Sequence, residues 1–462
     1  MSRVPGRPHV HFTPPSGWMN DPNGLVHVGG TWHLAYQHHP GDLSWGPMHW
    51  GHATSTDLVS WHHEPVALRP DHLGTAFSGS AVVDRDGVAG FGAGAIVAFF
   101  THFEEGLPQS QGVAGSTDGG TTWQPYDGNP VLRAPEGLVD FRDPKVLRYG
   151  GAGPDGHWVM VLAAGHEVVF YASADLLRWE PVSRFGREHG AHDGVWETPD
   201  LLELEVEGAG ERRWVLVVSV ISGGPAGGSG TQWFLGSFDG TAFVPADGPE
   251  VVRWVDRGGD FYAAQSWSNA PDGRRVWVAW MSNWAYGRTT PADTWRGVMT
   301  VPRELSLRDG PDGVALVQCP VRELHDRGRA VLEAKDVTVS EPWRPQVGEA
   351  FDLRLVLATG AGLELVLLDG AAHVTWRDGR LHVTRSVDGL VGADPAAQVV
   401  PVGGELPLRV VVDTCSVELF ADGGAVVLTN LVFPARPVTE PLLLLPDGGG
   451  VHLRLLELRD LT

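Results

Sequence analysis

The sequence of 462 residues contains little cysteine, few basic residues and no long apolar run. Its two cysteines, Cys319 and Cys415, lie far apart in the chain and define neither a disulfide framework nor a metal site, so we expect two reduced thiols. Only 34 basic residues stand against 56 acidic ones, and the formal net charge of −22 argues against nucleic acid or an anionic membrane as a partner. A neutral ligand is compatible with this charge.

The N-terminal segment MSRVPGRPHVHF carries positive charge but lacks the apolar core of a signal peptide. No stretch of the chain approaches the roughly 18 apolar residues of a membrane-spanning helix. The chain as given is therefore expected to be cytoplasmic, and to be secreted if a signal peptide has been removed from it.

Helical periodicity is nearly absent from the first two thirds of the chain. The 61 glycines and 34 prolines of the whole sequence are dispersed between short apolar runs, as turns are dispersed between strands. Runs rich in β-branched and aromatic residues are typical of strands, and they occur at residues 32–36, 95–100, 158–162, 214–218 and 276–280. The sequence therefore predicts an all-β protein.

A short pattern, Ser-x-Asp followed by an aromatic residue, occurs four times in the same part of the chain. The copies begin at Ser55, Ser116, Ser173 and Ser237, so they are separated by 61, 57 and 64 residues, a period that suits a unit of four short strands. The Asp of such a turn can bond its own backbone, while the aromatic residue anchors the returning strand. Together with the five strand-like runs, the repeat predicts a five-bladed β-propeller over residues 1–320.

Beyond residue 320 the pattern changes. Residues 321–345 have mixed charge and are expected to form a linker, with room for a short helix. Later segments such as 351–356 and 451–456 alternate apolar and polar residues between glycine-rich turns, and this period of two predicts a β-sandwich over residues 346–462. We expect this second unit to support the propeller structurally.

Three carboxylates, Asp21, Asp143 and Glu197, lie beside prolines in segments that precede a repeated turn by 30 to 40 residues. We therefore expect them at equivalent depths of different units, on the innermost strands, where proline holds its predecessor extended. A single Asp-Pro dipeptide is an ordinary turn. Three converging like charges, however, are costly unless they serve a ligand, and glycoside cleavage with retention uses two carboxyl groups about 5 to 5.5 Å apart.

Metal binding is the main alternative explanation for clustered acids and histidines. No loop of the sequence shows the alternating Asp/Asn spacing of a calcium site. The pairs His38-His39 and His62-His63 lack a further partner at the spacing of a zinc site. We therefore expect neither a metal ion nor a cofactor.

Longer motifs around the three carboxylates resemble a known enzyme family. Trp18-Met-Asn-Asp-Pro-Asn-Gly24, Phe141-Arg-Asp-Pro-Lys145 and Trp196-Glu-Thr-Pro-Asp200 resemble the signature motifs of glycoside hydrolase family 32, which holds invertases, inulinases and levanases. The resemblance continues through Trp45-Gly-Pro-Met-His-Trp-Gly-His52, Phe77-Ser-Gly-Ser80, Asp260-Phe-Tyr-Ala-Ala-Gln265, Trp295-Arg-Gly-Val-Met-Thr-Val-Pro-Arg-Glu-Leu305 and Asp413-Thr-Cys-Ser-Val-Glu-Leu-Phe420. It covers nearly the whole chain and implies a five-bladed propeller followed by a β-sandwich.

The resemblance also implies a role for each carboxylate. Asp21 matches the nucleophile that attacks C2 of fructose, and Glu197 matches the acid/base. Asp143, with Arg142 beside it, matches the residue that stabilises the transition state. The resemblance further implies a pocket for one terminal fructose, whose wall is formed by Asn20, Gln37, Trp45, Phe77, Ser78, Asp260 and Trp284.

The activity implied by the resemblance is that of an exo-acting, retaining β-fructosidase that removes terminal fructose from levan or inulin, with sucrose as a further candidate substrate. Within the family, a levan-specific enzyme that releases oligosaccharides and a fructosyltransferase are alternatives, because the same covalent intermediate can pass to a sugar hydroxyl. A non-catalytic carbohydrate-binding propeller would be expected to lack one of the three carboxylates, and all three are present. The expected partner is a fructose-containing oligo- or polysaccharide.

Two positions depart from the family pattern. Thr198 stands where the family most often has cysteine, and the change to another small polar residue is expected to leave activity intact. His38-His39 stands where the family more often has an aromatic residue and asparagine, so substrate preference on the leaving-group side is expected to depend on this place.

Overall fold

The computed structural model describes residues 6–151, 156–310, 313–358, 360, 362–385 and 404–462, together with the backbone of residues 396–398. The regular secondary structure of the described chain is almost entirely β-strand, and α1 (Arg322–Arg327) is its only α-helix. No helix in these described ranges is long and apolar enough to cross a membrane. The prediction of an all-β protein is therefore confirmed.

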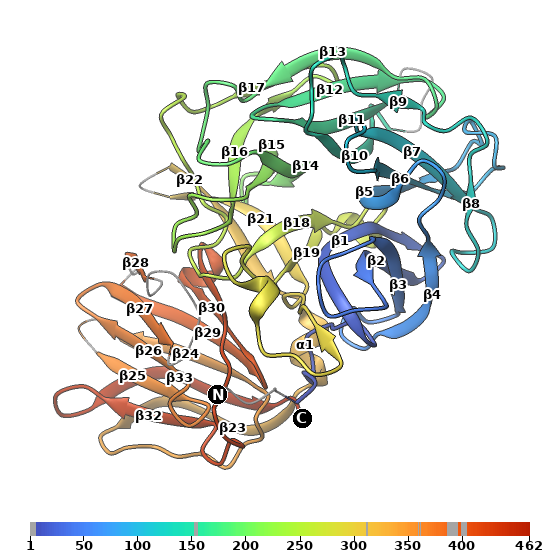
Figure 1. Ribbon diagram of the computed structural model, residues 1–462. Helices are drawn as coiled ribbons and strands as arrows, with labels where there is room; N and C mark the ends of the chain where they lie inside the picture. Colours follow the sequence, from blue (N-terminus) through green and yellow to red (C-terminus); the bar gives the residue numbers. More distant parts are fainter. Residues whose placement is uncertain are drawn as a thin grey trace.

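Five sheets follow one another along residues 17–320 (Figure 1). In spatial order, the first holds β20 (Trp295–Arg296), β1 (Gly17–Val28), β2 (Thr31–His39), β3 (His49–Ser55) and β4 (His62–Leu68), and the second holds β5 (Thr75–Asp84), β6 (Ala95–Phe103), β7 (Ser110–Ser116) and β8 (Gln124–Pro125), with β9 (Leu132–Arg133) also paired to β7. The third holds β10 (Phe141–Tyr149), β11 (His157–Ala164), β12 (Val168–Ser173) and β13 (Glu180–Phe185). The fourth holds β14 (Trp196–Glu205), β15 (Arg212–Val220), β16 (Gly230–Phe238) and β17 (Phe243–Pro245), and the fifth holds β18 (Tyr262–Ser266), β19 (Val276–Trp280), β21 (Arg303–Gly310) and β22 (Gly313–Pro320).

The repeated Ser-x-Asp pattern marks the same turn in four of these sheets. Each copy connects the third strand to the fourth, as between β3 and β4 or between β12 and β13. Within the turn the Asp side chain accepts backbone N–H groups: Asp57 Oδ1 accepts from Val59 at 2.9 Å, and Asp175 Oδ1 accepts from Leu177 at 3.0 Å. The repeat therefore reports a turn held by an Asp side chain, in agreement with the chemistry inferred from the sequence.

We call β1, β5, β10, β14 and β18 the first strands, because each is the earliest strand of its sheet along the chain. The first strands contact one another in a closed ring. β1 contacts β5, β5 contacts β10, β10 contacts β14, β14 contacts β18, and β18 contacts β1. A hydrophobic core lies between each pair of neighbouring sheets, such as the cluster that packs Phe99 of β6 against Leu162 of β11. The ring brings the first strands of sheets that are distant in sequence to one common centre.

Two further sheets lie at the C-terminal end of the chain (Figure 1). In spatial order, one holds β23 (Arg329–Val339), β33 (Val451–Asp460), β24 (Phe351–Ala358), β29 (Glu405–Asp413), β30 (Ser416–Ala421) and β31 (Val426–Leu431), and the other holds β28 (Ala396–Gln398), β27 (Arg380–Arg385), β26 (Ala372–Arg377), β25 (Leu363–Leu367) and β32 (Leu442–Pro446). The apolar residues of the period-two segments share one core, with Leu353 and Leu355 of β24 beside Leu365 of β25. The segment predicted as a linker, residues 321–345, contains α1 and the sheet strand β23.

A buried network of charges joins the C-terminal sheets to the first five. We call His11, Asp256, Arg303, Asp413 and Glu418 the interface cluster. His11 bonds Asp413 at 2.9 Å and Glu418 at 2.8 Å, while Arg303 pairs with Glu418 at 2.5 Å and with Asp256 at 3.2 Å. All five side chains are at most 1% exposed. Each cation meets two carboxylates, and each of the three carboxylates therefore has a cationic partner.

Candidate active site

Each of the five first strands carries a β-bulge close to its beginning. The register shifts lie between residues 19 and 22, 76 and 79, 142 and 145, 197 and 200, and 262 and 265. Pro144 and Pro199 lie within two of these bulges, where a residue without an N–H group forfeits no ladder bond, and Pro22 directly follows a third. Since the five strands form a ring, the bulges direct side chains from all five sheets toward one place.

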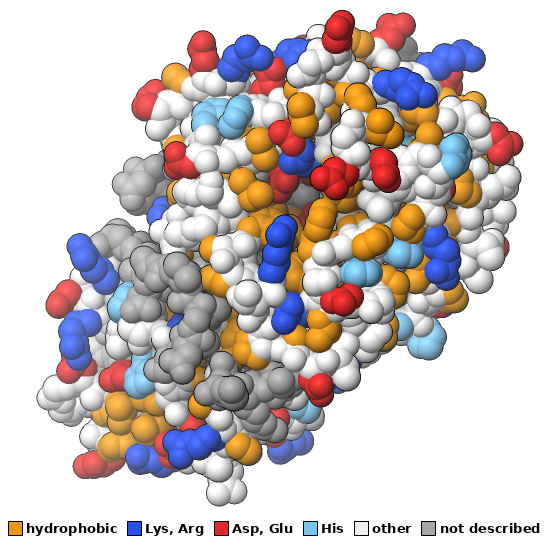
Figure 2. Space-filling model, in the orientation of Figure 1, with side chains coloured by type: hydrophobic (Ala, Val, Ile, Leu, Met, Phe, Trp, Pro, Cys, Tyr) orange, Lys and Arg blue, Asp and Glu red, His pale blue; other side chains and the backbone are white. Residues whose placement is uncertain are grey.

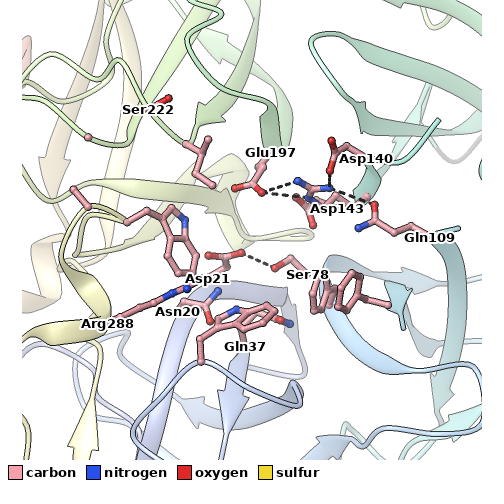
Figure 3. A pocket seen from close by; sticks show the side chains of 18 residues that line it. Asn20, Asp21, Gln37, Ser78, Gln109, Asp140, Asp143, Glu197, Ser222 and Arg288 are labelled. Carbon is pink, nitrogen blue, oxygen red and sulfur yellow. Dashed lines mark hydrogen bonds and ion pairs between the residues drawn. The ribbon is translucent and has the colours of Figure 1, made fainter. Parts of the chain in front are cut away.

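These side chains surround a cavity of about 610 Å³ at the centre of the ring (Figure 3). Acidic, basic and hydrophobic side chains meet at the surface over this centre (Figure 2). The cavity is lined by Asn20, Asp21, Gln37, Trp45, Phe77, Ser78, Phe103, Gln109, Asp140, Arg142, Asp143, Glu197, Ile221, Ser222, Gly228, Trp284, Ala285 and Arg288. Of the eleven site residues predicted from the sequence, ten line this single cavity.

Asp21 lies in the bulge of β1 with one carboxylate oxygen held and the other free. Ser78 Oγ donates a hydrogen bond to Asp21 Oδ2 at 2.7 Å, whereas Oδ1 is buried and meets no hydrogen-bond partner among the described residues. Burial raises the pKa of Asp21 to about 6, although Ser78 and Asn20 lower it, and the nearby charge of Glu197 raises it further. Asp21 as a whole lines the cavity, so its carboxylate group lies where a ligand would bind.

Asp143 lies in the bulge of β10 and has a left-handed backbone conformation, with φ of 66°. Its N–H donates to Thr101 Oγ1 at 3.0 Å, and its Oδ2 accepts from the N–H of Thr198 at 2.9 Å. Burial raises the pKa of Asp143 to about 7, with Arg142 acting in the opposite direction and the carboxylates Glu197 and Asp21 adding to the rise. A non-glycine residue at positive φ costs free energy, and such strain concentrates at functional sites.

Glu197 faces the other two carboxylates from the beginning of β14 (Figure 3). Arg142 Nη2 donates to Glu197 Oε1 at 2.9 Å, and the hydroxyl of Tyr262 donates to Glu197 Oε2. Arg142 also donates to Asp140 Oδ1 at 2.5 Å and to Gln109 Oε1 at 3.3 Å. Burial would lower the pKa of Arg142, but Glu197 and the neighbouring aspartates more than offset this effect and raise it, so the guanidinium stays charged.

We call Asp21, Arg142, Asp143 and Glu197 the catalytic cluster. It contains three carboxylates against one guanidinium, within a buried space. The raised pKa of Asp21 and of Asp143 shows that the negative charges are not fully compensated. Such a mismatch of buried charge is typical of acid/base and nucleophilic chemistry.

Aromatic side chains form two walls of the cavity. On one side Trp45 packs edge-on against Phe77, with ring centroids 5.9 Å apart, and Phe77 stacks on Phe103 at 4.3 Å. On the other side Trp284 stacks on Trp18 at 6.2 Å. Flat apolar faces beside carboxylates suit a sugar ring, which presents C–H groups on its faces and hydroxyls at its edge.

Arg288 joins the two aromatic walls at the rim of the cavity. Its guanidinium lies 5.6 Å from the ring centroid of Trp45 and 5.5 Å from that of Trp284. The side chain is exposed and lines the cavity. Sequence reasoning missed Arg288, because an exposed arginine outside the recognised motifs carries no signal of its own.

Below the catalytic cluster the centre of the ring is crossed by a buried ion pair. Lys145, two residues after Asp143 on β10, pairs with Asp200 Oδ1 of β14 at 3.1 Å. Its ammonium group also donates to the carbonyl oxygen of Ser266 on β18 at 2.9 Å. These bonds cross-link three first strands beneath the carboxylates, so the cavity ends there.

Asp260 is the one predicted site residue that the structure does not place in the cavity. Its side chain is fully buried and pairs with Arg385 Nη1 at 2.7 Å, and it also accepts hydrogen bonds from the hydroxyl of Tyr286 at 2.5 Å and the N–H of Leu431 at 2.8 Å. Both carboxylate oxygens of Asp260 bond the protein, and Asp260 does not line the cavity with the other ten predicted residues. Direct contact between Asp260 and substrate stays a prediction.

The departures noted in the sequence lie outside the cavity lining. His38 is buried and bonds the carbonyl oxygen of Trp18 at 2.9 Å, and burial lowers its pKa to about 4. His39 bonds the carbonyl oxygen of Ser44 at 2.9 Å. Thr198 is buried, and its hydroxyl meets no hydrogen-bond partner in the described ranges.

Besides Arg288, sequence reasoning missed Gln109, Asp140 and Tyr262. Gln109 accepts hydrogen bonds from the N–H of Phe141 at 2.7 Å and from Arg142, so it orients the guanidinium from another strand. Asp140 precedes its partner Arg142 by two residues, and Tyr262 lies inside a recognised motif. Asp140, directly before one motif, and Tyr262, within another, could have been selected as polar neighbours of motif residues. Gln109 has no such sequence signal.

Comparisons with known proteins agree with this geometry. The model of the glycosyl hydrolases family 32 N-terminal domain matches residues 11–320, and that of the family 32 C-terminal domain matches residues 373–458. A levanase from Bacillus subtilis (strain 168) is 44% identical over 98% of this chain and 70% of its own length.

Two solved structures resemble the whole chain. The exo-inulinase from Aspergillus awamori superposes with a TM-score of 0.91 at 32% identity and covers 99% of this chain and 98% of its own. The β-fructofuranosidase from Schwanniomyces occidentalis, solved with fructosyl-erythritol, superposes with a TM-score of 0.90 at 30% identity over the same shares of the two chains.

Proposed function

The chain belongs to glycoside hydrolase family 32, and we propose that it is an exo-acting, retaining β-fructosidase that releases terminal fructose from fructans and from sucrose. The printed names of its relatives, a levanase, an exo-inulinase and a β-fructofuranosidase, support this substrate class. The fructosyl-erythritol bound by the last of these supports a fructose-containing ligand for this chain. We also propose that the ring of five sheets is a five-bladed propeller and that the two C-terminal sheets form a β-sandwich.

The observation that carries the proposal is that Asp21, Asp143 and Glu197, from three different strands, line one cavity. In the first step a carboxylate oxygen of Asp21 attacks C2 of the terminal fructose. A proton from Glu197 passes to the glycosidic oxygen, the C2–O bond breaks, and the leaving sugar departs as an alcohol. The product is a covalent ester between fructose and Asp21.

In the second step a water molecule takes the place of the leaving sugar. Glu197, now ionised, accepts a proton from this water while its oxygen attacks C2 and displaces Asp21 as a carboxylate. Fructose leaves with its original anomeric configuration, and Glu197 is protonated again. Arg142, which donates to Glu197 Oε1, orients this carboxyl group through both steps.

Asp143 is proposed to hold the ring hydroxyls of the fructose. Its Oδ2 is fixed by the N–H of Thr198, and its backbone is held by Thr101, so the carboxylate has one orientation. A fixed negative charge beside C2 stabilises the positive charge that develops there in the transition state. Trp45, Phe77 and Trp284 are proposed to pack against the apolar faces of the sugar.

Exo-action is supported by the closed lower end of the cavity. The ion pair between Lys145 and Asp200 crosses the ring beneath the catalytic cluster, so a fructan chain cannot pass through. A terminal residue is therefore the part of the polymer that fits against Asp21. The rest of the chain is proposed to extend past the rim that holds Arg288.

Product analysis tests the proposal directly. The purified protein is incubated with sucrose, inulin and levan, and the products are followed by chromatography from the earliest time points, with Asp21→Asn as the inactive control. Free fructose is expected as the first and dominant product from both fructans. Short oligosaccharides as the dominant products would support a levan-specific oligosaccharide-releasing enzyme, and lengthened products from sucrose would support a fructosyltransferase. No product from any of the three substrates would overturn the proposed activity.

A further inference from the structure

Arg385 of the C-terminal sheets reaches the loop region of the first five sheets. It lies at the end of β27, and its side chain is only 6% exposed. Its Nη1 donates to Asp260 Oδ2 at 2.7 Å, to the hydroxyl oxygen of Tyr286 at 3.4 Å and to the carbonyl oxygen of Leu431 at 3.2 Å. One guanidinium nitrogen from β27 thus contacts the segment before β18 and the segment after β19.

Asp260 passes this contact on to Tyr286. The tyrosine hydroxyl donates to Asp260 Oδ1, the oxygen that does not face Arg385. The backbone N–H of Asp260 donates to the carbonyl oxygen of Thr429 at 3.0 Å, and the N–H of Arg257 donates to that of Val427 at 2.8 Å. The segment before β18 is therefore docked on β31, and Asp260 Oδ1 accepts the hydrogen bond from Tyr286.

Tyr286 belongs to a short segment, residues 283–288, that forms part of the cavity rim. Trp284, Ala285 and Arg288 of this segment line the cavity. Asn283 ties the segment to the loop before β16, because it accepts from the N–H of Ser229 at 3.1 Å and donates to the carbonyl oxygen of Gly259 at 2.8 Å. Both ends of the segment are also held, because the N–H of Trp284 donates to Ser229 Oγ at 3.0 Å and Arg296 donates to the carbonyl oxygen of Arg288 at 2.7 Å. The Tyr286 hydroxyl anchors the middle of the segment.

We propose that Arg385 is a positioning residue, through which the C-terminal sheets fix residues 283–288 in the orientation that binds substrate. The chain of contacts runs from Arg385 to Asp260, from Asp260 to Tyr286, and from there to the neighbouring rim residues Trp284 and Arg288. This inference rests on the proposed function only in naming fructans as the substrate. It assigns the C-terminal unit a part in substrate binding beyond support of the fold.

The contact chain does not include the catalytic cluster. Asp21, Asp143 and Glu197 lie on β1, β10 and β14 and are held by Ser78, Thr198 and Arg142. Loss of the Arg385 contact is therefore expected to weaken substrate binding at the rim more than it slows the chemical step. A higher KM with little change in kcat is the signature of lost binding that is equal in ground state and transition state.

The test compares Arg385→Met with a matched variant, Arg409→Met. Arg409 is also largely buried in the C-terminal sheets, at 15% exposed, and binds Asp352 with two hydrogen bonds of 2.8 Å. In the part of the chain that the structure describes, Arg409 also bonds the carbonyl oxygen of Pro320, and it bonds neither Asp260 nor any of residues 283–288. Both variants remove a buried ion pair, and only the first removes the link to the rim.

We expect Arg385→Met to raise the KM for inulin about tenfold while kcat changes by less than about threefold. Arg385→Lys, which retains the charge, should recover part of this loss, and Arg409→Met should leave KM within about twofold of the wild type. Tyr286→Phe should raise KM in the same direction. Because Arg385 and Tyr286 act through one chain of contacts, the double variant should show much less than the product of the two single effects.

A second readout needs no activity. Hydrogen exchange of the backbone amides of Tyr286 and Gly287, both of which donate to the carbonyl oxygen of Asn283, should become faster in Arg385→Met and not in Arg409→Met. Equal KM values for the two methionine variants, or unchanged exchange in Arg385→Met, would overturn the proposal. An inactive wild type with the expected change in exchange would instead refute the proposed activity and leave the positioning role intact.

Discussion

The molecule contains two buried groups of charges, and they differ in how the charges are balanced. The interface cluster sets two cations, Arg303 and His11, against three carboxylates, and each cation bonds two of them. The catalytic cluster sets one cation, Arg142, against three carboxylates, and this cation bonds Glu197 but no oxygen of Asp21. The interface cluster is more deeply buried, at no more than 1% side-chain exposure against 10% for Arg142 and 16% for Glu197, and it also differs in that each of its carboxylates bonds a cation.

The pKa values of the carboxyl groups shift in opposite directions in the two clusters. In the interface cluster burial would raise the pKa of Asp413 and of Glu418, but His11 lowers that of Asp413, and Arg303 with His11 lowers that of Glu418, below their ordinary values. In the catalytic cluster burial prevails and raises the pKa of Asp21 to about 6 and that of Asp143 to about 7. In the interface cluster the cations stabilise the ionised carboxylates. In the catalytic cluster the raised pKa values let Asp21 and Asp143 gain or lose a proton near neutral pH.

The comparison predicts opposite outcomes for removal of one charge. In the catalytic cluster, Asp21→Asn is expected to lower kcat/KM on sucrose by about 10⁴-fold or more, because the attacking oxygen is lost. The free energy of unfolding at pH 7 should stay the same or rise, since an uncompensated buried carboxylate is replaced by a neutral group. Kinetics and denaturant unfolding of the same preparation check both halves.

A large loss of stability in Asp21→Asn would contradict this assignment, because it would show that the aspartate is matched within the fold. Residual activity within about a hundredfold of the wild type would contradict its role as nucleophile.

In the interface cluster, Glu418→Gln is expected to lower stability while leaving activity nearly unchanged. Arg303 and His11 each lose a buried anionic partner, so the free energy of unfolding should fall by about 3 to 5 kcal/mol. The specific activity of the folded protein at 25 °C should stay within about threefold of the wild type, because Glu418 does not line the cavity. Chemical denaturation and initial-rate assays measure the two quantities, and an activity loss without a stability loss would break the comparison.

The pH dependence should also separate activity from stability. Asp21 must be ionised to attack and Asp143 to stabilise the transition state, and their folded pKa values are about 6 and about 7, so kcat/KM should begin to fall below about pH 7 and fall more steeply below about pH 6. Because the folded pKa of Asp21 lies above the ordinary value of 3.8, the group favours the folded state below about pH 4, and this contribution is lost as the pH rises through about 6. A pH–rate profile of kcat/KM provides the measurement. An acid limb near pH 4 would show that the charge of Asp21 is stabilised within the fold and that its pKa is not raised.

Ser78→Ala is expected to have the smallest effect. Removal of the hydrogen bond from Ser78 Oγ to Asp21 Oδ2 should raise the pKa of Asp21 further, so the acid limb should move upward by about half a unit to one unit. Ser80→Ala is the matched control, because Ser80 lies on the same strand but donates to the carbonyl oxygen of Pro144. If the acid limb of kcat/KM lies at the same pH in both variants, the role assigned to Ser78 is wrong.

Much of the site could be predicted from the sequence because its residues lie in motifs whose spacing matches the repeat. Asp21 and Asp143 each precede a proline, and the spacing of the repeat alone predicts that both lie on first strands. The bulges could not be predicted, since register is set by pairing with the second strand, as at Arg142 and Lys145. The strained φ of Asp143 follows from that bulge.

Asp260 shows why a motif does not by itself locate a side chain. Its carboxylate lies within a recognised segment, but its partner Arg385 is 125 residues away and belongs to another sheet. The contact depends on how the C-terminal sheets dock on the first five, and no local pattern reports that. Arg288 was missed for a related reason, because only the fold brings Trp45 and Trp284 to either side of it.

The central claim is that Asp21 of the catalytic cluster forms a covalent fructosyl-enzyme. The most direct test uses Glu197→Gln with a fructosyl donor whose leaving group needs no proton, because the second step then lacks its base and the intermediate should accumulate. Peptide mapping by mass spectrometry should find one added hexose on the peptide that contains Asp21, and none in the Asp21→Asn/Glu197→Gln double variant. A hexose on a peptide without Asp21, or release of fructose with inverted configuration, would contradict the account.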